Sequence, residues 1–284
     1  MYESFFGLTK KPFELVPNPD FLYKSRTHNK VGMYLDYAMR ENTGFILLTG
    51  EVGSGKTTII RSLLKKLGPE VQVSKVFNTK LSSEELLATI NDDFGIAIEG
   101  KNKVHMLKDL NQFLIDQYGT GRRSVVIVDE AQNLSVDSLE ELRMLSNLET
   151  NDAKLLQIIL VGQPELKRIL SVSELRQLRQ RISIHCHLQS LSREEMEAYI
   201  WHRLDIAGNR QAVEFSDGAL ALVFDYSGGI PRLINVMCDF LLLSAFTEEV
   251  RFISEELVAE VAGDPQFEGQ FFPRSRRGGA TSTP

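Results

Sequence analysis

The feature that most constrains the fold of this chain is the segment LLTGEVGSGKTTII at residues 47–60. It places Gly50, Gly55, Lys56 and Thr57 in the spacing G-x-x-x-x-G-K-[ST], after an apolar run and before a helical pattern. Glycines at these positions let the backbone turn tightly, so that successive N–H groups point into one concave nest. A strand, a loop and a helix in this order predict a site for the phosphates of a nucleotide.

The same loop carries groups that suit a nucleoside triphosphate and its metal ion. The Lys56 side chain is long enough to reach the β- and γ-phosphates, and the Thr57 hydroxyl is a suitable ligand for Mg²⁺. The helix that follows turns its positive end toward the phosphates. The residues expected to bind ATP are Gly50, Glu51, Val52, Gly53, Ser54, Gly55, Lys56, Thr57 and Thr58.

A second motif, SVVIVDEAQ at residues 124–132, is a continuous apolar strand that ends in two carboxylates. At the C-terminal end of a parallel strand, Asp129 is expected to hold Mg²⁺ together with Thr57. The adjacent Glu130 is expected to act as the general base that polarises the attacking water. An Asp-Glu pair after a strand also suits a helix N-cap, but the phosphate loop earlier in the chain favours the catalytic interpretation.

Two polar residues at the ends of other predicted strands complete the expected active site. Gln163, in LQIILVGQPEL at 156–166, is expected near the γ-phosphate. Asn78, in VSKVFNTK at 73–80, is expected to hydrogen-bond Glu130. This bond would keep the carboxylate out of line with the attacking water until activation. Both positions also fit an ordinary turn.

Arginines are expected to supply further positive charge. Arg176, Arg179 and Arg181 precede the last predicted strand, and they also fit the solvated basic face of a short helix. Because backbone amides and one lysine leave charge on the transferred phosphoryl group uncompensated, we expect Arg181 to act in trans on a neighbouring subunit. Arg232 follows Pro231 in the first turn of a later helix, where a cation is unfavourable, and is therefore expected to bind the γ-phosphate.

Apolar strands alternate with helical patterns through the first two thirds of the chain. Strands are expected at 44–49, 71–77, 123–128, 156–162 and 182–188, and helices at 29–41, 56–67, 83–94, 104–118 and 136–148. This alternation predicts an α/β fold of the P-loop NTPase kind, a parallel sheet sandwiched by helices. Only helices are expected after it, at 192–206, 216–226, 231–247 and 254–262, which predicts a small all-helical lid.

The patterns divide the chain into four expected parts. They are an N-terminal arm at 1–27, a nucleotide-binding α/β domain at 28–189, the helical lid at 190–263 and a flexible tail at 264–284. The arm mixes prolines with aromatic residues, which suits an extended segment lying on a folded body.

Composition argues against several classes of protein. A net charge of −6 over 284 residues does not suit a protein that binds nucleic acid by overall electrostatic attraction. Two cysteines far apart in sequence indicate no disulfide framework, and the start of the chain does not read as a signal peptide. We therefore expect a cytoplasmic protein that reaches a membrane only through a partner.

Taken together, these motifs resemble those of the AAA+ ATPases over residues 28–263. The arm FFGLTKKPFELVPNPDFLY and the segments VDEAQNL, LVGQPEL and LRQRI are similar to the ExeA/GspA-type secretion ATPases, a group that includes MshM-like and PEP-CTERM exosortase-associated ATPases. The resemblance implies Mg²⁺-dependent ATP hydrolysis by a homo-oligomer, such as a hexamer. It also implies service to envelope secretion, pilus or exopolysaccharide export machinery, with a membrane-embedded component as partner at the inner membrane.

The resemblance has one departure, and two other functions stay open. ExeA-type proteins continue into a transmembrane segment and a periplasmic peptidoglycan-binding domain, which this sequence lacks, so the shorter exosortase-associated kind is expected. One alternative is a DNA-associated regulator resembling TnsC, which the acidic charge disfavours. The other is a nucleotide-dependent scaffold that turns over only when a partner arrives.

Overall fold

A computed structural model describes residues 1–41, 43–77, 79–150 and 153–264. The chain forms two compact units. An α/β unit comprises Arg26–Val52 and Lys56–Gln189, and a helical unit comprises Met1–Ser25, Gly53–Gly55 and the described residues from Ser190 to Asp264.

The α/β unit is built on a five-stranded parallel sheet in the order β2-β3-β4-β1-β5. The strands are β1 (Phe45–Gly50), β2 (Val71–Val76), β3 (Arg123–Val128), β4 (Leu156–Gly162) and β5 (Ile182–Leu188). In the centre of the sheet, Leu47 of β1 pairs in register with Leu160 of β4. Five parallel strands with intervening helices confirm the predicted α/β fold class.

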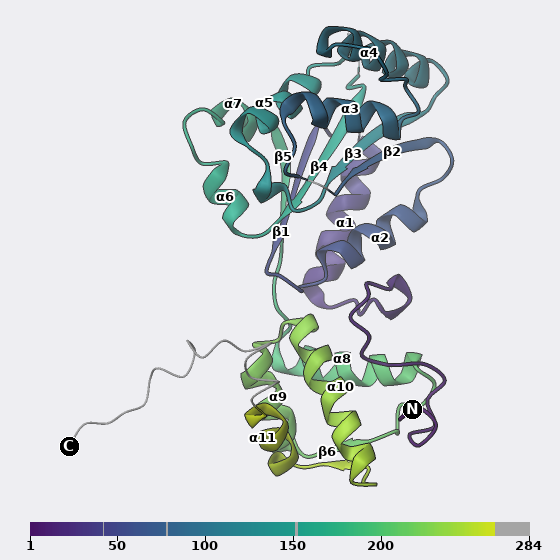
Figure 1. The fold of residues 1–284 in the computed structure, drawn as a ribbon, viewed down its shortest axis with the longest axis vertical. Helices are drawn as coiled ribbons and strands as arrows, with labels where there is room; N and C mark the ends of the chain where they lie inside the picture. The colour runs from purple at the N-terminus through teal and green to yellow at the C-terminus, as the bar shows by residue number, and fades with distance from the viewer. Residues whose placement is uncertain (42, 78, 151–152, 265–284) are drawn as a thin grey trace, which may run out of the picture. The chain divides into compact units, whose positions relative to one another are not determined.

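Alternate residues of each strand pack on opposite faces of the sheet. Phe45 and Leu47 of β1 join one apolar cluster, and Ile46 and Leu48 join the other. The first cluster contains side chains of α3, α4 and α5, and the second contains side chains of α1 and α2, so helices cover both faces (Figure 1). These helices are α1 (Arg26–Glu41), α2 (Lys56–Lys66), α3 (Ser83–Asp93), α4 (Lys103–Gly119) and α5 (Val136–Leu145).

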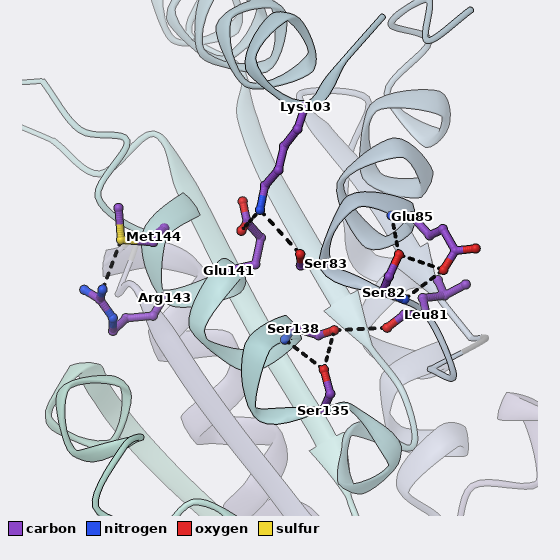
Figure 2. Close-up of polar contacts among 10 residues, drawn as sticks. All are labelled: Leu81, Ser82, Ser83, Glu85, Lys103, Ser135, Ser138, Glu141, Arg143 and Met144. Atoms are coloured by element: carbon purple, nitrogen blue, oxygen red, sulfur yellow. Dashed lines mark hydrogen bonds and ion pairs between the residues drawn. The ribbon is translucent and has the colours of Figure 1, made fainter.

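Polar contacts tie together the three helices that share the first face (Figure 2). Ser82 caps α3 in a capping box with Glu85, which satisfies backbone donors at the start of that helix. Lys103 at the start of α4 pairs with Glu141 on α5 at 2.5 Å, and the hydroxyl of Ser138 donates to the carbonyl of Leu81 at 3.0 Å. These contacts fix α3, α4 and α5 relative to one another.

Three short helices lie in the loops of the α/β unit, and the pattern analysis did not resolve them as separate elements. They are η2 (Ala131–Asn133), α6 (Glu165–Ile169) and α7 (Arg176–Arg181). Helices of three to six residues complete at most two turns, so they carry little of the periodic signal by which longer helices are predicted.

The helical unit has its own core. Its long helices are α8 (Arg193–Ile206), α9 (Asp217–Ser227), α10 (Pro231–Thr247) and α11 (Glu255–Gly263). Ser192 and Glu195 form the capping box expected at the start of α8. The unit also contains a short parallel pair, β6 (Glu214–Phe215) with β7 (Phe252–Ile253), which the sequence did not predict because two-residue strands show no alternation.

The first 25 residues pack into the helical unit. The side chains of Tyr2, Phe6, Leu8 and Phe13 are buried in the same apolar cluster as α8 and α10. A short 3-10 helix, η1 (Pro19–Phe21), ends this arm against α8. Within the described residues, no helix combines the length and the apolar character needed to cross a bilayer.

Candidate active site

The phosphate loop joins the end of β1 at Gly50 to the start of α2 at Lys56. Gly53 and Gly55 have φ angles of 80° and 101°, in the region where side chains with a Cβ are strained. A Cβ at Gly53 would also lie 2.4 Å from the Cβ of Arg232. Position 53 therefore needs glycine for two reasons, which are its positive φ angle and the close approach of Arg232.

Lys56 folds back over the loop that precedes it. Its Nζ donates to the carbonyls of Gly50 and Glu51 at 2.8 and 2.9 Å, and only 6% of the residue is exposed. Burial lowers the pKa of the ammonium group, and the nearby carboxylates of Glu130 and Asp129 oppose that shift. The arrangement holds the lysine charge at the loop, where anionic phosphates would also bind.

Thr57 and Asp129 meet across the ends of α2 and β3. Thr57 Oγ1 donates to Asp129 Oδ2 at 3.2 Å. Burial raises the pKa of Asp129, although hydrogen bonds from the Glu130 backbone and from Thr57 partly offset this. A hydroxyl and a carboxylate this close are the oxygen donors that Mg²⁺ prefers, so these residues fit the predicted ion.

Glu130 has an unusual backbone. Its φ and ψ are 52° and 38°, the left-handed conformation, which costs a residue with a side chain about 1–2 kcal/mol. Its backbone N–H donates to Asp129 Oδ1 at 2.9 Å, and its carbonyl accepts from the N–H of Asn133 at 3.0 Å. These bonds hold the turn after β3 in the strained form, and the strain falls on the residue predicted to be the general base.

Two glutamine side chains converge on the Glu130 carboxylate. Gln163, just past the end of β4, donates from Nε2 to Glu130 Oε2 at 3.2 Å. Gln132 donates to the same oxygen at 2.5 Å, and its own Oε1 accepts from the backbone N–H of Gln163 at 3.0 Å. The sequence analysis did not single out Gln132; its position two residues after Glu130 was the only available signal.

The structure therefore gathers several of the predicted site residues in the α/β unit. Those linked by hydrogen bonds or electrostatic interactions are Lys56, Thr57, Asp129, Glu130 and Gln163. Asn78 lies outside the described residues, so its predicted contact with Glu130 stays a prediction.

Of the predicted arginines, Arg232 lies against Gly53 of the phosphate loop, whereas the side chains of Arg181 and Arg179 have partners away from the loop. Arg181, at the end of α7, donates to the hydroxyl of Ser146 at 3.2 Å, and Arg179 donates to the carbonyl of Leu170 at 2.9 Å. Arg176 is exposed at the start of α7. Arg232 is exposed in the first turn of α10, where its backbone N–H donates to the carbonyl of Gly53 at 3.2 Å.

Comparison with known proteins identifies an AAA domain in the sequence. The family model described as "AAA domain" matches residues 39–170. The chain is 46% identical over 247 residues to general secretion pathway protein A of Aeromonas hydrophila, which covers 87% of this chain and 45% of that protein. It is 27% identical over 191 residues to DNA polymerase III subunit gamma of Buchnera aphidicola, covering 66% and 48%. The chain spans about half the length of these curated relatives.

Solved structures with the same fold are more distant in sequence. ORC2 of Aeropyrum pernix superposes with a TM-score of 0.67 at 18% identity, over 88% of this chain and 70% of that chain. The RuvB branch migration motor of Thermotoga maritima gives 0.56 at 20% identity, over 91% and 72%. At such identities the likeness concerns the fold alone.

Proposed function

The chain belongs to the AAA ATPases related to general secretion pathway protein A, and on this premise we propose that it hydrolyses ATP with Mg²⁺ as an oligomeric enzyme. The observation that supports the proposal most directly is the cluster around Glu130. A strained glutamate beside Asp129, in contact with Gln163 from the next strand, provides a general base next to a metal-binding carboxylate.

The predicted site residues divide the proposed chemistry among them. Backbone N–H groups of the loop and the charge of Lys56 bind the phosphates, and Thr57 and Asp129 hold Mg²⁺. When bound, Mg²⁺ offsets negative charge on the phosphate oxygens. Glu130 accepts a proton from the attacking water while the water oxygen bonds to the γ-phosphorus and the bond from that phosphorus to the ADP oxygen breaks, which releases ADP and phosphate. Gln163 binds the γ-phosphate oxygens by its amide.

Two arginines are proposed to complete the site. Arg181 approaches the ATP of a neighbouring subunit, since the resemblance to AAA+ ATPases implies a homo-oligomer. Arg232, whose backbone N–H donates to the Gly53 carbonyl of the phosphate loop, is proposed to bind the γ-phosphate. In each case a guanidinium offsets charge on the transferred phosphoryl group, a role for which planar donors are well suited.

The proposed setting is envelope secretion or export. The relative in Aeromonas hydrophila is named as a general secretion pathway protein, and this chain matches about half of it. We propose that the chain acts in the cytoplasm at the inner membrane. A membrane-embedded secretion or export component would be its partner and would use the free energy of ATP hydrolysis.

An ATPase assay with the purified chain tests the proposal. Wild-type protein with Mg²⁺ should release phosphate from ATP, and Glu130→Gln should release it roughly 10²–10⁴ times more slowly while still binding ATP. Glu84→Gln, an exposed glutamate on α3, is the matched control and should keep the wild-type rate. A Glu130→Gln variant as fast as wild type would show that another group activates the water.

A further inference from the structure

We propose that Gln132 is a positioning residue that aims the Glu130 carboxylate for water activation. The inference rests on the proposed function, because it takes Glu130 as the general base. It assigns a role to the last residue of the segment SVVIVDEAQ, to which the sequence analysis gave none, and the hydrogen bonds at both ends of its side chain support it.

The Gln132 amide links the turn after β3 to the segment after β4. Its Nε2 donates to Glu130 Oε2 in the turn after β3, and its Oε1 accepts from the backbone N–H of Gln163 past the end of β4. The carboxylate of Glu130 is thereby linked to the backbone one residue past β4, whose last residue, Gly162, pairs with Thr49 of β1. A side chain fixed at both ends orients its partner more firmly than one fixed at a single end.

Space at the end of β4 also constrains this amide. A Cβ at Gly162 would lie 2.7 Å from Gln132 Oε1 and 2.8 Å from Cδ2 of Leu166. Only glycine at Gly162 therefore lets the Gln132 amide lie against the end of β4 without displacing its neighbours. The side chain occupies a fitted position rather than an open surface.

Gln163 differs from Gln132 in how it is held. Among the described residues, the Gln163 amide group makes one hydrogen bond, to Glu130 Oε2, so it can turn to a phosphate oxygen by breaking a single contact. Gln132 would then remain as the donor that keeps the carboxylate in place. The two glutamines thus have separate functions, Gln163 toward the nucleotide and Gln132 toward the base.

The first test removes both hydrogen bonds of Gln132 at nearly constant volume. Gln132→Met should lower kcat for ATP about 10- to 100-fold, the effect of a misplaced catalytic group, while KM for ATP stays within about twofold. The matched control is Gln112→Met on α4, because Gln112 also donates to a carboxylate, that of Asp116 at 2.9 Å. The control should keep the wild-type kcat and KM.

The second test keeps one end of the link. In Gln132→Glu a carboxylate oxygen can still accept from the Gln163 N–H, but the other oxygen faces Glu130 as a like charge. The donor to Glu130 is lost and the two carboxylates repel, so kcat should fall at least as far as in Gln132→Met, while KM for ATP stays within about twofold. If Gln132 served only to hold Gln163, this variant would keep the wild-type kcat.

The outcomes separate the inference from the proposed function. If Glu130→Gln is inactive while Gln132→Met or Gln132→Glu keeps the wild-type kcat, Gln132 does not position the base and the inference is wrong. If Glu130→Gln itself keeps the wild-type rate, the assignment of the base fails and the inference falls with it. Melting temperatures of all variants identify any loss of kcat that comes from unfolding.

Discussion

Thr57 Oγ1 donates a hydrogen bond to Asp129 Oδ2 at 3.2 Å, although the two residues lie 72 positions apart in the sequence. One belongs to the first turn of α2, and the other follows the last residue of β3. The contact brings the two predicted magnesium ligands together. It also has a cost for folding, because Asp129 is partly removed from water and, among the described residues, the Thr57 hydroxyl is the only side-chain donor to its carboxylate.

Asp129→Asn should stabilise the folded protein while it removes Mg²⁺-dependent turnover. Burial raises the pKa of Asp129 in the folded state. At pH values between the ordinary and the raised pKa, the folded protein therefore binds more protons than the unfolded chain. The free energy of unfolding falls as the pH rises through that range. Asparagine carries no charge there. At pH 7 the variant should melt about 2–4 °C higher than wild type, the shift that roughly 1 kcal/mol produces in a chain of this size.

Differential scanning calorimetry across pH checks this prediction. The difference in melting temperature should shrink as the pH is lowered through the raised pKa of Asp129, because the wild-type carboxyl then becomes neutral as well. Asp36→Asn, at an exposed ion pair with Lys66, should show no comparable change with pH. If Asp129→Asn melts below wild type at pH 7, the charged carboxylate does not destabilise the folded state.

Lys56→Ala should abolish ATP binding in isothermal titration calorimetry. The substitution removes the charge expected to meet the β- and γ-phosphates, and it leaves the carbonyls of Gly50 and Glu51 without their Nζ donor. Lys66→Ala, an exposed lysine at the end of the same helix, should bind ATP as wild type does. Tight ATP binding by Lys56→Ala would contradict the proposed role of the loop.

Arg181→Ala should bind ATP yet hydrolyse it poorly. An arginine acting in trans contributes about 10³–10⁵ in rate where it has been isolated. Mixing Arg181→Ala with Glu130→Gln should restore part of the activity, because some interfaces then pair an intact Glu130 with an intact Arg181. Phosphate release from the mixture, compared with each variant alone at the same total concentration, measures the rescue.

Size-exclusion chromatography of the mixture provides the control for that experiment. If mixed oligomers form and the mixture stays as inactive as either variant, Arg181 does not act in trans, and Arg179 and Arg176 become the next candidates. The hydrogen bond from Arg181 to Ser146 suggests a further variant, Ser146→Ala, which should leave Arg181 charged but less firmly oriented.

Arg203→Lys should loosen the N-terminal arm. The buried guanidinium of Arg203 on α8 donates to the carbonyls of Pro12 and Glu14 and stacks 4.3 Å from the centre of the Phe21 ring. Lysine keeps the charge but cannot supply these planar donors. The free energy of unfolding should fall by about 1–3 kcal/mol, the cost of leaving buried carbonyls without partners.

Limited proteolysis and urea denaturation together check the prediction for the arm. Residues 1–25 of Arg203→Lys should be cut faster than those of wild type, whereas Arg210→Lys, an exposed arginine of the same unit, should leave the rate unchanged. Equal cutting rates for Arg203→Lys and wild type would mean that the apolar contacts of the arm hold it without the arginine.

The elements of the fold were predictable because their signals are local. The strands predicted at 123–128, 156–162 and 182–188 have those bounds in the structure, and the other two agree within one residue at each end. A parallel strand is encoded by a short stretch rich in apolar residues, such as FILL in β1 and VVIV in β3, and each helix by its own periodicity and cap. The helix predicted at 136–148 ends earlier, at Leu145, since Ser146 caps it and a loop follows.

The candidate site was predictable only where its residues form one motif or end a strand. Lys56 and Thr57 are contiguous with their glycines, and Asp129 and Gln163 directly follow apolar strands. Gln132 has no such signal, because its partner atom on Gln163 comes near only when β4 lies beside β3. Sequence spacing cannot show that neighbourhood, since parallel strands joined by helices can be ordered in more than one way.

The sequence by itself determined the phosphate loop, the alternation of strands with helices and the helical segment that follows. These depend on backbone conformation and on apolar periodicity within short stretches of chain. Only the tertiary structure decided the strand order β2-β3-β4-β1-β5, the link from Gln132 to Glu130 and the burial of Tyr2 and Phe6 in the helical unit. Each of these depends on which apolar faces pack together across long sequence separations, and many pairings satisfy the same local pattern.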